Sequence, residues 1–297
     1  MTTEAVRAPT HRVDFAARFV VRAAMTAPSI ENSQPWSFAS SRDVISVYTD
    51  PERAASQTDP IGREMVMSGG AALFNLRLAM HHLGFAGDVR LLPRAGRLDH
   101  LADVRWGRYS SPTAYNELLY GAMTRRRTHH GRFTVAPVPA PLIAELGRLA
   151  RDERAALHVI SGPDQIRILA ELVQMAEVTQ RVYHDERAAP NGSGPADHRH
   201  NGHSPRWPAS APPRQPDGHA LGVIAVLATH DDRPLDWLLA GQVLQRLLLH
   251  ATTHGISAAF HTQPLELSDY RRQIQRQFTG GTFPQILLRL GHTGALR

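Results

Sequence analysis

The fold is decided by the stretch APSIENSQPW, residues 27–36, which brackets short polar side chains between two prolines. Pro28 has no N–H to continue a helix, and a residue before proline is pushed out of the α region. The chain therefore turns here, and Ser29, Asn32 and Gln34 lie on a loop between a helix and a strand. The residues alone leave two interpretations open: a polar turn that ends a helix, or a loop that offers hydroxyl and amide groups to a ligand.

Outward from this loop, hydrophobic spacing and turn residues predict a chain that mixes helices and strands. Asp59 and Pro60 are typical of a helix start, as N-cap and first helical residue, and Gly84 is typical of a helix end. The fold class is therefore α+β. The expected helices are 13–25, 60–83, 114–123, 141–150, 163–183 and 235–254; the expected strands are 44–48, 89–92, 102–106, 157–160, 221–227 and 286–290.

An internal repeat appears when the chain is shifted by 171 positions. Gly70 then falls on Gly241 and Gly84 on Gly255, and several leucines coincide between the two long helices. The Gly69-Gly70 pair costs about 1 kcal/mol per glycine against alanine, so close packing of another backbone is the expected compensation. We interpret the chain as two copies of one unit, residues 1–115 and 116–297, with antiparallel or mixed sheets and long central helices.

Composition narrows the classes of function. The 297 residues contain no cysteine, which excludes disulfides, thiolate catalysis and cysteine metal sites. The chain has no run of 18 apolar residues and no signal-peptide pattern, so a soluble cytoplasmic protein without a membrane partner is expected. All 33 basic residues are arginine and the net charge is +6, but the arginines are scattered, which disfavours nucleic-acid binding.

The motif Pro28-Ser29-x-x-Asn32-x-Gln34-Pro35-Trp36 resembles the flavin-binding loop of the nitroreductase family, FMN enzymes that take hydride from NAD(P)H. Three further motifs, at residues 59–64, 125–128 and 284–291, resemble the Acg-like branch of that superfamily. The resemblance spans about residues 15 to 292. It implies a nitroreductase-like fold in which the homodimer of ordinary members is fused into one chain.

In a fused dimer, the resemblance implies one FMN site per chain, built from both halves. The first half supplies the 28–36 loop and the second half supplies a basic segment for the phosphate. The converse pair of motifs is missing. His130 departs from the Arg or Lys of the family, and Arg289 either reaches the phosphate or points to solvent. The flavin-binding residues that the resemblance implies are Pro28, Ser29, Asn32, Gln34, Arg125, Arg126, Arg127, Thr128, His130, Thr262, Gln263, Pro264 and Arg289.

The implied activity is NAD(P)H-dependent reduction of a small acceptor, nitro or quinone-like, with NAD(P)H as a transient electron donor. Flavin carries the electron chemistry, so no catalytic side chain is assigned. Residues 187–218 are rich in Pro, Gly, Ser and His and form a lid, a docked loop or a disordered segment; the resemblance favours a lid over the flavin. A non-enzymatic FMN storage protein is the alternative function. A monomer that is an internal pseudo-dimer is expected, with a homodimer as the alternative.

A metal protein is a further alternative. His198, His200, His203 and His219 lie in or beside the variable segment, next to Asp197. A solvated His-rich loop is the favoured interpretation. We find no histidine pair at i, i+4 on a predicted helix with an acidic residue beside it, and we expect no metal.

Overall fold

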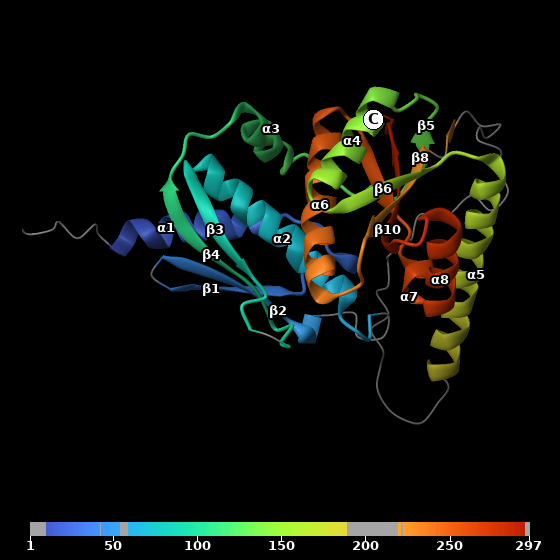
Figure 1. The fold of residues 1–297 in the computed structure, drawn as a ribbon, viewed down its shortest axis with the longest axis horizontal. Helices are drawn as coiled ribbons and strands as arrows, with labels where there is room; N and C mark the ends of the chain where they lie inside the picture. The colour runs from blue at the N-terminus through green and yellow to red at the C-terminus, as the bar shows by residue number, and fades with distance from the viewer. Residues whose placement is uncertain are drawn as a thin grey trace, which may run out of the picture. The chain divides into compact units, whose positions relative to one another are not determined.

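The computed structural model describes residues 10–41, 43–53, 59–94, 96–188, 219–220 and 222–294, which divide between two compact units (Figure 1). Unit 1 comprises residues 1–125 and 233–249, and unit 2 comprises residues 126–232 and 250–297. The chain thus leaves unit 1, returns to it for most of one long helix, and ends in unit 2. Among the described residues, no helix is both long and apolar enough to cross a membrane.

Unit 1 is a four-stranded antiparallel sheet with helices packed against it. The strand order is β1-β2-β4-β3. The longest helices of the unit are α2 and α6, and α6 belongs to unit 1 through Leu249. Its elements are α1 (Thr10–Ala24), β1 (Trp36–Ser41), β2 (Val44–Thr49), α2 (Arg63–His82), β3 (Phe85–Leu91), β4 (His100–Tyr109), α3 (Ala114–Ala122) and α6 (Pro234–Thr253), with short 3₁₀ helices at Ile30–Asn32 and Pro51–Arg53.

Helices α2 and α6 approach one another through the two glycines that the sequence repeat pairs. A Cβ on Gly70 would fall on the carbonyl oxygen of Leu238, and a Cβ on Gly241 would fall on the carbonyl oxygen of Met67. Backbone therefore packs directly on backbone at this crossing, which only residues without a side chain permit. The expectation that the Gly69-Gly70 pair allows close packing of another backbone is confirmed for Gly70, whereas Gly69 faces the Leu101 side chain.

A chain of buried hydrogen bonds connects α6 to the end of α1. Gln245 Nε2 donates to Asn75 Oδ1 on α2 at 2.8 Å, and both side chains are fully buried. Asn75 Nδ2 in turn donates to the carbonyl oxygen of Ala23 at 3.3 Å and to Thr26 Oγ1 at 3.1 Å. Because buried polar groups are costly unless paired, these bonds fix the point at which the chain leaves α1 and enters the 27–36 loop.

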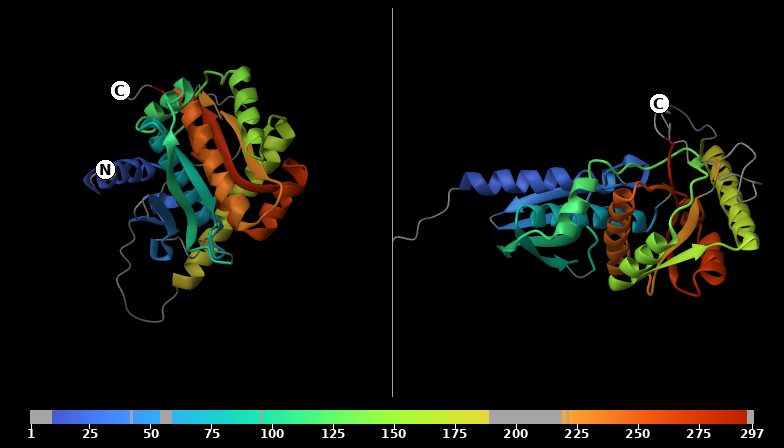
Figure 2. Two further views of the ribbon diagram at one scale, coloured as in Figure 1. Left: turned by 60° about the vertical axis from the view of Figure 1, so that its left-hand side comes forward. Right: turned by 90° about the horizontal axis from the view of Figure 1, so that it is seen from above.

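Unit 2 has its own four-stranded antiparallel sheet, with the order β6-β8-β10-β9. Figure 2 shows α4, α5 and α8 around this sheet. Its apolar core joins α5, α8 and the two central strands, with Leu172, Ile224 and Ile274 fully buried. The elements are β5 (Phe133–Thr134), α4 (Ala140–Asp152), β6 (Ala155–Ile160), α5 (Pro163–Ala188), β7 (His219–Ala220), β8 (Val223–Thr229), β9 (Ser257–Phe260), α7 (Gln263–Glu266), α8 (Ser268–Phe278) and β10 (Phe283–Gly291).

The two sheets share one strand order: in each, the fourth strand along the chain lies between the second and the third. In each, a 20-residue helix precedes the third strand, and a glycine with positive φ follows that helix: Gly84, with a φ of 82°, follows α2, and Gly255, with a φ of 71°, follows α6. The predicted duplication of one unit, with its boundary near residue 115, is a statement about evolutionary origin and stays a prediction. Residues 189–218 of the predicted lid lie outside the described residues.

The structure corrects several predicted boundaries. Helix α2 begins at Arg63 rather than Pro60, because Gly62 takes a left-handed conformation and makes a turn first. The N-cap residue is therefore Gly62 rather than the predicted Asp59, although Asp59 Oδ2 accepts the N–H of Met65, in the first turn, at 2.8 Å. The sequence patterns did not indicate β1, β9 or α8. In α8 only Ile274 and Phe278 are buried, so its apolar periodicity is too short to stand out.

Candidate functional site

The 27–36 loop is a tightly folded segment of unit 1. A single 3₁₀ turn spans Ile30–Asn32, and the backbone takes positive φ at Asn32 (56°) and Gln34 (49°). Left-handed conformations are uncommon for residues other than glycine, and Asn tolerates them better than most. Ser29 Oγ accepts the backbone N–H of Gln34 at 2.9 Å and so closes the loop. The loop is therefore held in one shape by its own side chains.

The base of the loop is anchored in the core of unit 1. Trp36 is 3% exposed and packs with Ala27, Ala71 and Ala72. Ser29 and Gln34 are half-buried, and the side chain of Asn32 is exposed. The tryptophan thus packs as in a structural turn, and the interpretation in which the hydroxyl and amide groups bind a ligand stays a prediction.

The basic segment at 125–130 divides at the boundary between the units. Arg125 belongs to unit 1, where its Nε donates to the carbonyl oxygen of Gly121 at the end of α3, at 3.3 Å. Arg127 is exposed and its Nη1 donates to the carbonyl oxygen of Arg126 at 2.8 Å. His130 is also exposed. These three side chains are therefore exposed to solvent, unlike that of Arg126.

Arg126 differs from its neighbours because its guanidinium is partly buried. Its Nη1 lies 3.5 Å from Thr128 Oγ1, and its buried Nε has no hydrogen-bond partner among the described residues. Burial lowers the pKa of Arg126 below its ordinary value, and the charge of Arg127 adds to the shift. A buried cationic donor without an acceptor is costly, and an anion beside it would relieve that cost.

Thr128 extends the sheet of unit 2 beyond β9. It forms a parallel bridge with Ala258, and the next N–H, of His129, donates to the Ala258 carbonyl oxygen at 2.8 Å. The His129 ring packs on Phe133, with ring centroids 4.9 Å apart. Strand β9 then leads directly into His261 and the short helix α7. The basic segment and the 261–264 segment therefore flank the same edge strand.

The alternative in which the Arg289 side chain points to solvent is wrong. Arg289 is 3% exposed on β10, and its Nε donates to His261 Nε2 at 2.9 Å. Its guanidinium also lies over the Phe133 ring, 5.5 Å from the centroid. Burial lowers the pKa of Arg289 to about 10. Burial, and then the charge of Arg289, hold the pKa of His261 well below its ordinary value, so this imidazole is neutral and accepts the bond.

Thr128 and Arg289 thus both lie on backbone segments that pair with β9, whereas Thr262, Gln263 and Pro264 stand at the start of α7. Thr262 is the N-cap residue, Gln263 is half-buried and Pro264 is buried. The sequence interpretation did not assign His261 or Phe133 to the site, although both contact the Arg289 guanidinium. A signal existed for His261, which directly precedes the predicted Thr262–Pro264 segment.

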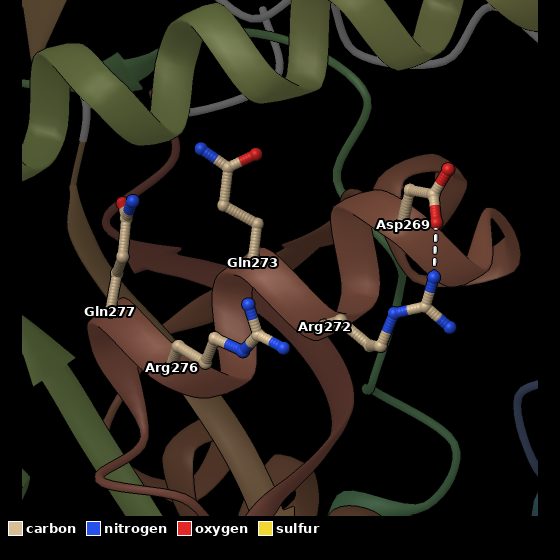
Figure 3. Close-up of a pocket in the computed structure, with 5 residues that line it drawn as sticks. All are labelled: Asp269, Arg272, Gln273, Arg276 and Gln277. Atoms are coloured by element: carbon tan, nitrogen blue, oxygen red, sulfur yellow. Dashed lines mark hydrogen bonds and ion pairs between the residues drawn. The ribbon is translucent and has the colours of Figure 1, made fainter.

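A hollow on the surface of unit 2 follows an exposed face of α8 (Figure 3). No residue that the sequence assigns to the site lines it. Asp269 and Arg272 form an ion pair one helical turn apart, and most of the other lining groups are exposed. Cofactor pockets are mostly lined by apolar side chains, whereas every side chain that lines this hollow is polar or charged, so we assign no cofactor to it. The residues that line it are Asp269, Arg272, Gln273, Arg276 and Gln277.

Comparison with known proteins gives relatives along nearly the whole chain. A Mycobacterium tuberculosis protein named "Putative NAD(P)H nitroreductase Rv3131" is 29% identical over 296 residues, which cover 92% of this chain and 84% of that protein. The M. tuberculosis protein named "Putative NAD(P)H nitroreductase acg" is 25% identical over 288 residues, covering 91% of this chain and 87% of that protein. No family model matches the chain.

Among solved structures, an FMN-bound nitroreductase from Bacteroides fragilis aligns with 60% of this chain and 91% of its own, at 11% identity and a TM-score of 0.40. The relatives in sequence, rather than this structural likeness, confirm the resemblance that the motifs carry. Over nine tenths of its length, the chain is similar in sequence to M. tuberculosis proteins that carry the name putative NAD(P)H nitroreductase, acg among them.

Proposed function

We propose that this chain is an FMN-binding oxidoreductase of the nitroreductase type, which uses NAD(P)H to reduce a small acceptor with a nitro or quinone-like group. Two relatives that cover nine tenths of the chain carry the NAD(P)H nitroreductase name. The observation that carries the proposal is the buried Nε of Arg126, a cationic donor without a partner among the described residues.

The surroundings of Arg126 suit the phosphate of FMN. A phosphate dianion is bound best by the forked donors of arginine together with hydroxyl donors. Arg126 and Thr128 supply one of each, 3.5 Å apart at Nη1 and Oγ1, on a segment fixed by its bridge to β9. In this proposal Arg126 and Thr128 hold the phosphate, and Arg127, which is exposed, contributes longer-range attraction.

The 27–36 loop offers side-chain hydroxyl and amide groups that can hydrogen-bond to the polar groups of a ligand. Ser29 Oγ accepts the Gln34 N–H, which leaves its own proton to donate and one lone pair to accept a further hydrogen bond. Asn32 offers an exposed amide at a backbone position whose left-handed conformation fixes its direction. We propose that these two side chains bind and orient the polar groups of FMN. When bound, FMN would supply the hydride and electron chemistry.

The first experiment is the visible absorption spectrum of the purified full-length chain, before and after FMN is added and excess removed. The expected result is retained flavin absorption, with the released cofactor identified as FMN. Anaerobic mixing with NADH and with NADPH, followed by menadione or a nitroaromatic compound, then measures reduction and reoxidation. Flavin that binds but is reduced by neither nucleotide would indicate storage, and a protein that rejects FMN would overturn the proposal.

A further inference from the structure

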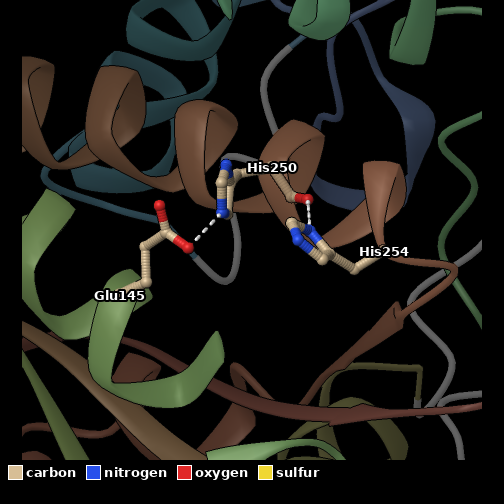
Figure 4. A group of neighbouring side chains, drawn as sticks. All are labelled: Glu145, His250 and His254. Carbon is tan, nitrogen blue, oxygen red and sulfur yellow. Dashed lines mark hydrogen bonds and ion pairs between the residues drawn. The ribbon is translucent and has the colours of Figure 1, made fainter. Parts of the chain in front are cut away.

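A cluster of metal-ligating side chains lies in unit 2, on different elements from the proposed flavin residues. His250, on the last turn of α6, and His254, just beyond it, are four residues apart, and Glu145 faces them from α4 (Figure 4). One ligand atom from each of the three lies within 4.8 Å of the others. We propose that Glu145, His250 and His254 bind one divalent transition cation of the Zn²⁺ type.

The separation between the first two ligands fits such a cation. His250 Nε2 lies 3.3 Å from Glu145 Oε2. Zn²⁺ binds nitrogen and oxygen at about 2.0–2.2 Å, so two ligands at a tetrahedral angle stand roughly 3.4 Å apart. Two histidines and one carboxylate are a donor set that Zn²⁺ accepts, with the fourth position left to water.

The surrounding hydrogen bonds orient two of the ligands. His254 Nδ1 lies 3.1 Å from the carbonyl oxygen of His250, which can only accept, so Nδ1 carries the proton and Nε2 keeps a lone pair for a cation. Arg148 Nη2 lies 3.4 Å from Glu145 Oε1, the oxygen not facing His250. Glu145 therefore has one oxygen engaged by Arg148 and the other directed at the cluster.

The location also favours positive charge. Carbonyl groups at the last turn of a helix carry partial negative charge and stabilise cations there. His250 is 4% exposed, whereas His254 is exposed and Glu145 is half-buried, so the cluster opens to solvent on one side. The sequence did not indicate this group of three, because the acidic partner comes from a helix about 100 residues earlier in the chain.

The test uses the full-length chain after chelator treatment, titrated with ZnCl₂ by calorimetry and with Co²⁺ by visible absorption. Wild type is compared with His254→Ala and Glu145→Gln, which change side chains that are not buried. His230→Ala is the matched control, because that side chain is 91% exposed and stands beside Asp231. FMN content and circular dichroism are measured in the same samples, so flavin binding and folding are scored separately from the cation.

The expected result is one Zn²⁺ equivalent that both site variants bind at least tenfold more weakly and that His230→Ala retains, since second-sphere changes alone cost about 10–100-fold. Mg²⁺, which prefers oxygen ligands, is expected not to compete. If folded His254→Ala and Glu145→Gln bind Zn²⁺ with the stoichiometry and affinity of wild type, the proposal is wrong and the cluster is an ordinary His–Glu ion pair.

Discussion

The crossing of α2 and α6 makes a sharp stability prediction for Gly241→Ala. A methyl group on Gly241 would fall on the carbonyl oxygen of Met67, a backbone atom that cannot rotate away as a side chain could. Overpacking of this kind costs about 1–3 kcal/mol, and a rigid neighbour places the cost toward the upper end. Against it stands a gain of up to about 1 kcal/mol from replacing a helical glycine by alanine. We expect the free energy of unfolding to fall by roughly 1–2 kcal/mol.

The matched control is Gly121→Ala on α3, in the same unit. No atom outside its own local helix lies within 4 Å of the Cβ that alanine would add there, so only the helix propensity changes. We expect this variant to gain up to about 1 kcal/mol. Chemical denaturation followed by far-ultraviolet circular dichroism compares the two variants with wild type. A Gly241→Ala protein as stable as Gly121→Ala would show that the helices separate at no cost and would refute the reasoning.

Three further predictions concern the flavin residues and pH. Arg126→Gln should weaken FMN binding by about 1.5–3 kcal/mol, the contribution of a charge-assisted hydrogen bond, while Arg127→Gln changes it little because Arg127 is exposed; fluorescence titration with FMN measures both. Asn32→Gly, which keeps the positive φ and removes the amide, should also weaken FMN binding, by about 1 kcal/mol. If Arg126→Gln and Asn32→Gly both bound FMN with the affinity of wild type, the site predicted from both halves would be contradicted. The pKa of His261 in the folded chain lies well below 6.5, so the unfolded chain binds more protons than the folded chain as the pH falls through 6.5. The free energy of unfolding should therefore decrease by up to about 1.4 kcal/mol for each pH unit from pH 6.5 down to 5. Denaturant midpoints measured at several pH values would show this decrease.

Local sequence patterns predicted those parts of the fold that local chemistry determines. Long amphipathic helices, the glycine that ends α2 and the buried strands all follow from periodicity and turn residues. The start of α2 was placed too early because Pro60 is compatible with both a first helical turn and the preceding bend. Helix α8 was missed because most of its surface is polar and its burial depends on tertiary contacts through Ile274 and Phe278.

For the candidate site, too, local features could be predicted from the sequence, whereas features that depend on tertiary contacts could not. The 27–36 motif identified a loop that the structure finds closed by its own Ser29. The burial of Arg289 could not be predicted, because the alternation of Leu and Arg in 288–290 is typical of a strand with one exposed face. In the fold this strand is central, so both faces are covered and the arginine packs on Phe133 and His261. Burial on both faces comes from the order of strands, which residue spacing does not encode.

The dependence of the loop on α6 is the least local feature of the chain. Gln245 donates to Asn75, and Asn75 donates to Ala23 and Thr26 at the entrance of the loop. Without α6, the Oδ1 atom of the fully buried Asn75 would lose the hydrogen bond that it accepts from Gln245. The Gly70 backbone would also lose the Leu238 backbone that it packs against. The loop that resembles a flavin-binding motif is therefore supported by a helix that the chain supplies only after it has built most of unit 2. A fragment that ends at residue 125 would keep every residue of the motif and lose the packing that holds it in place.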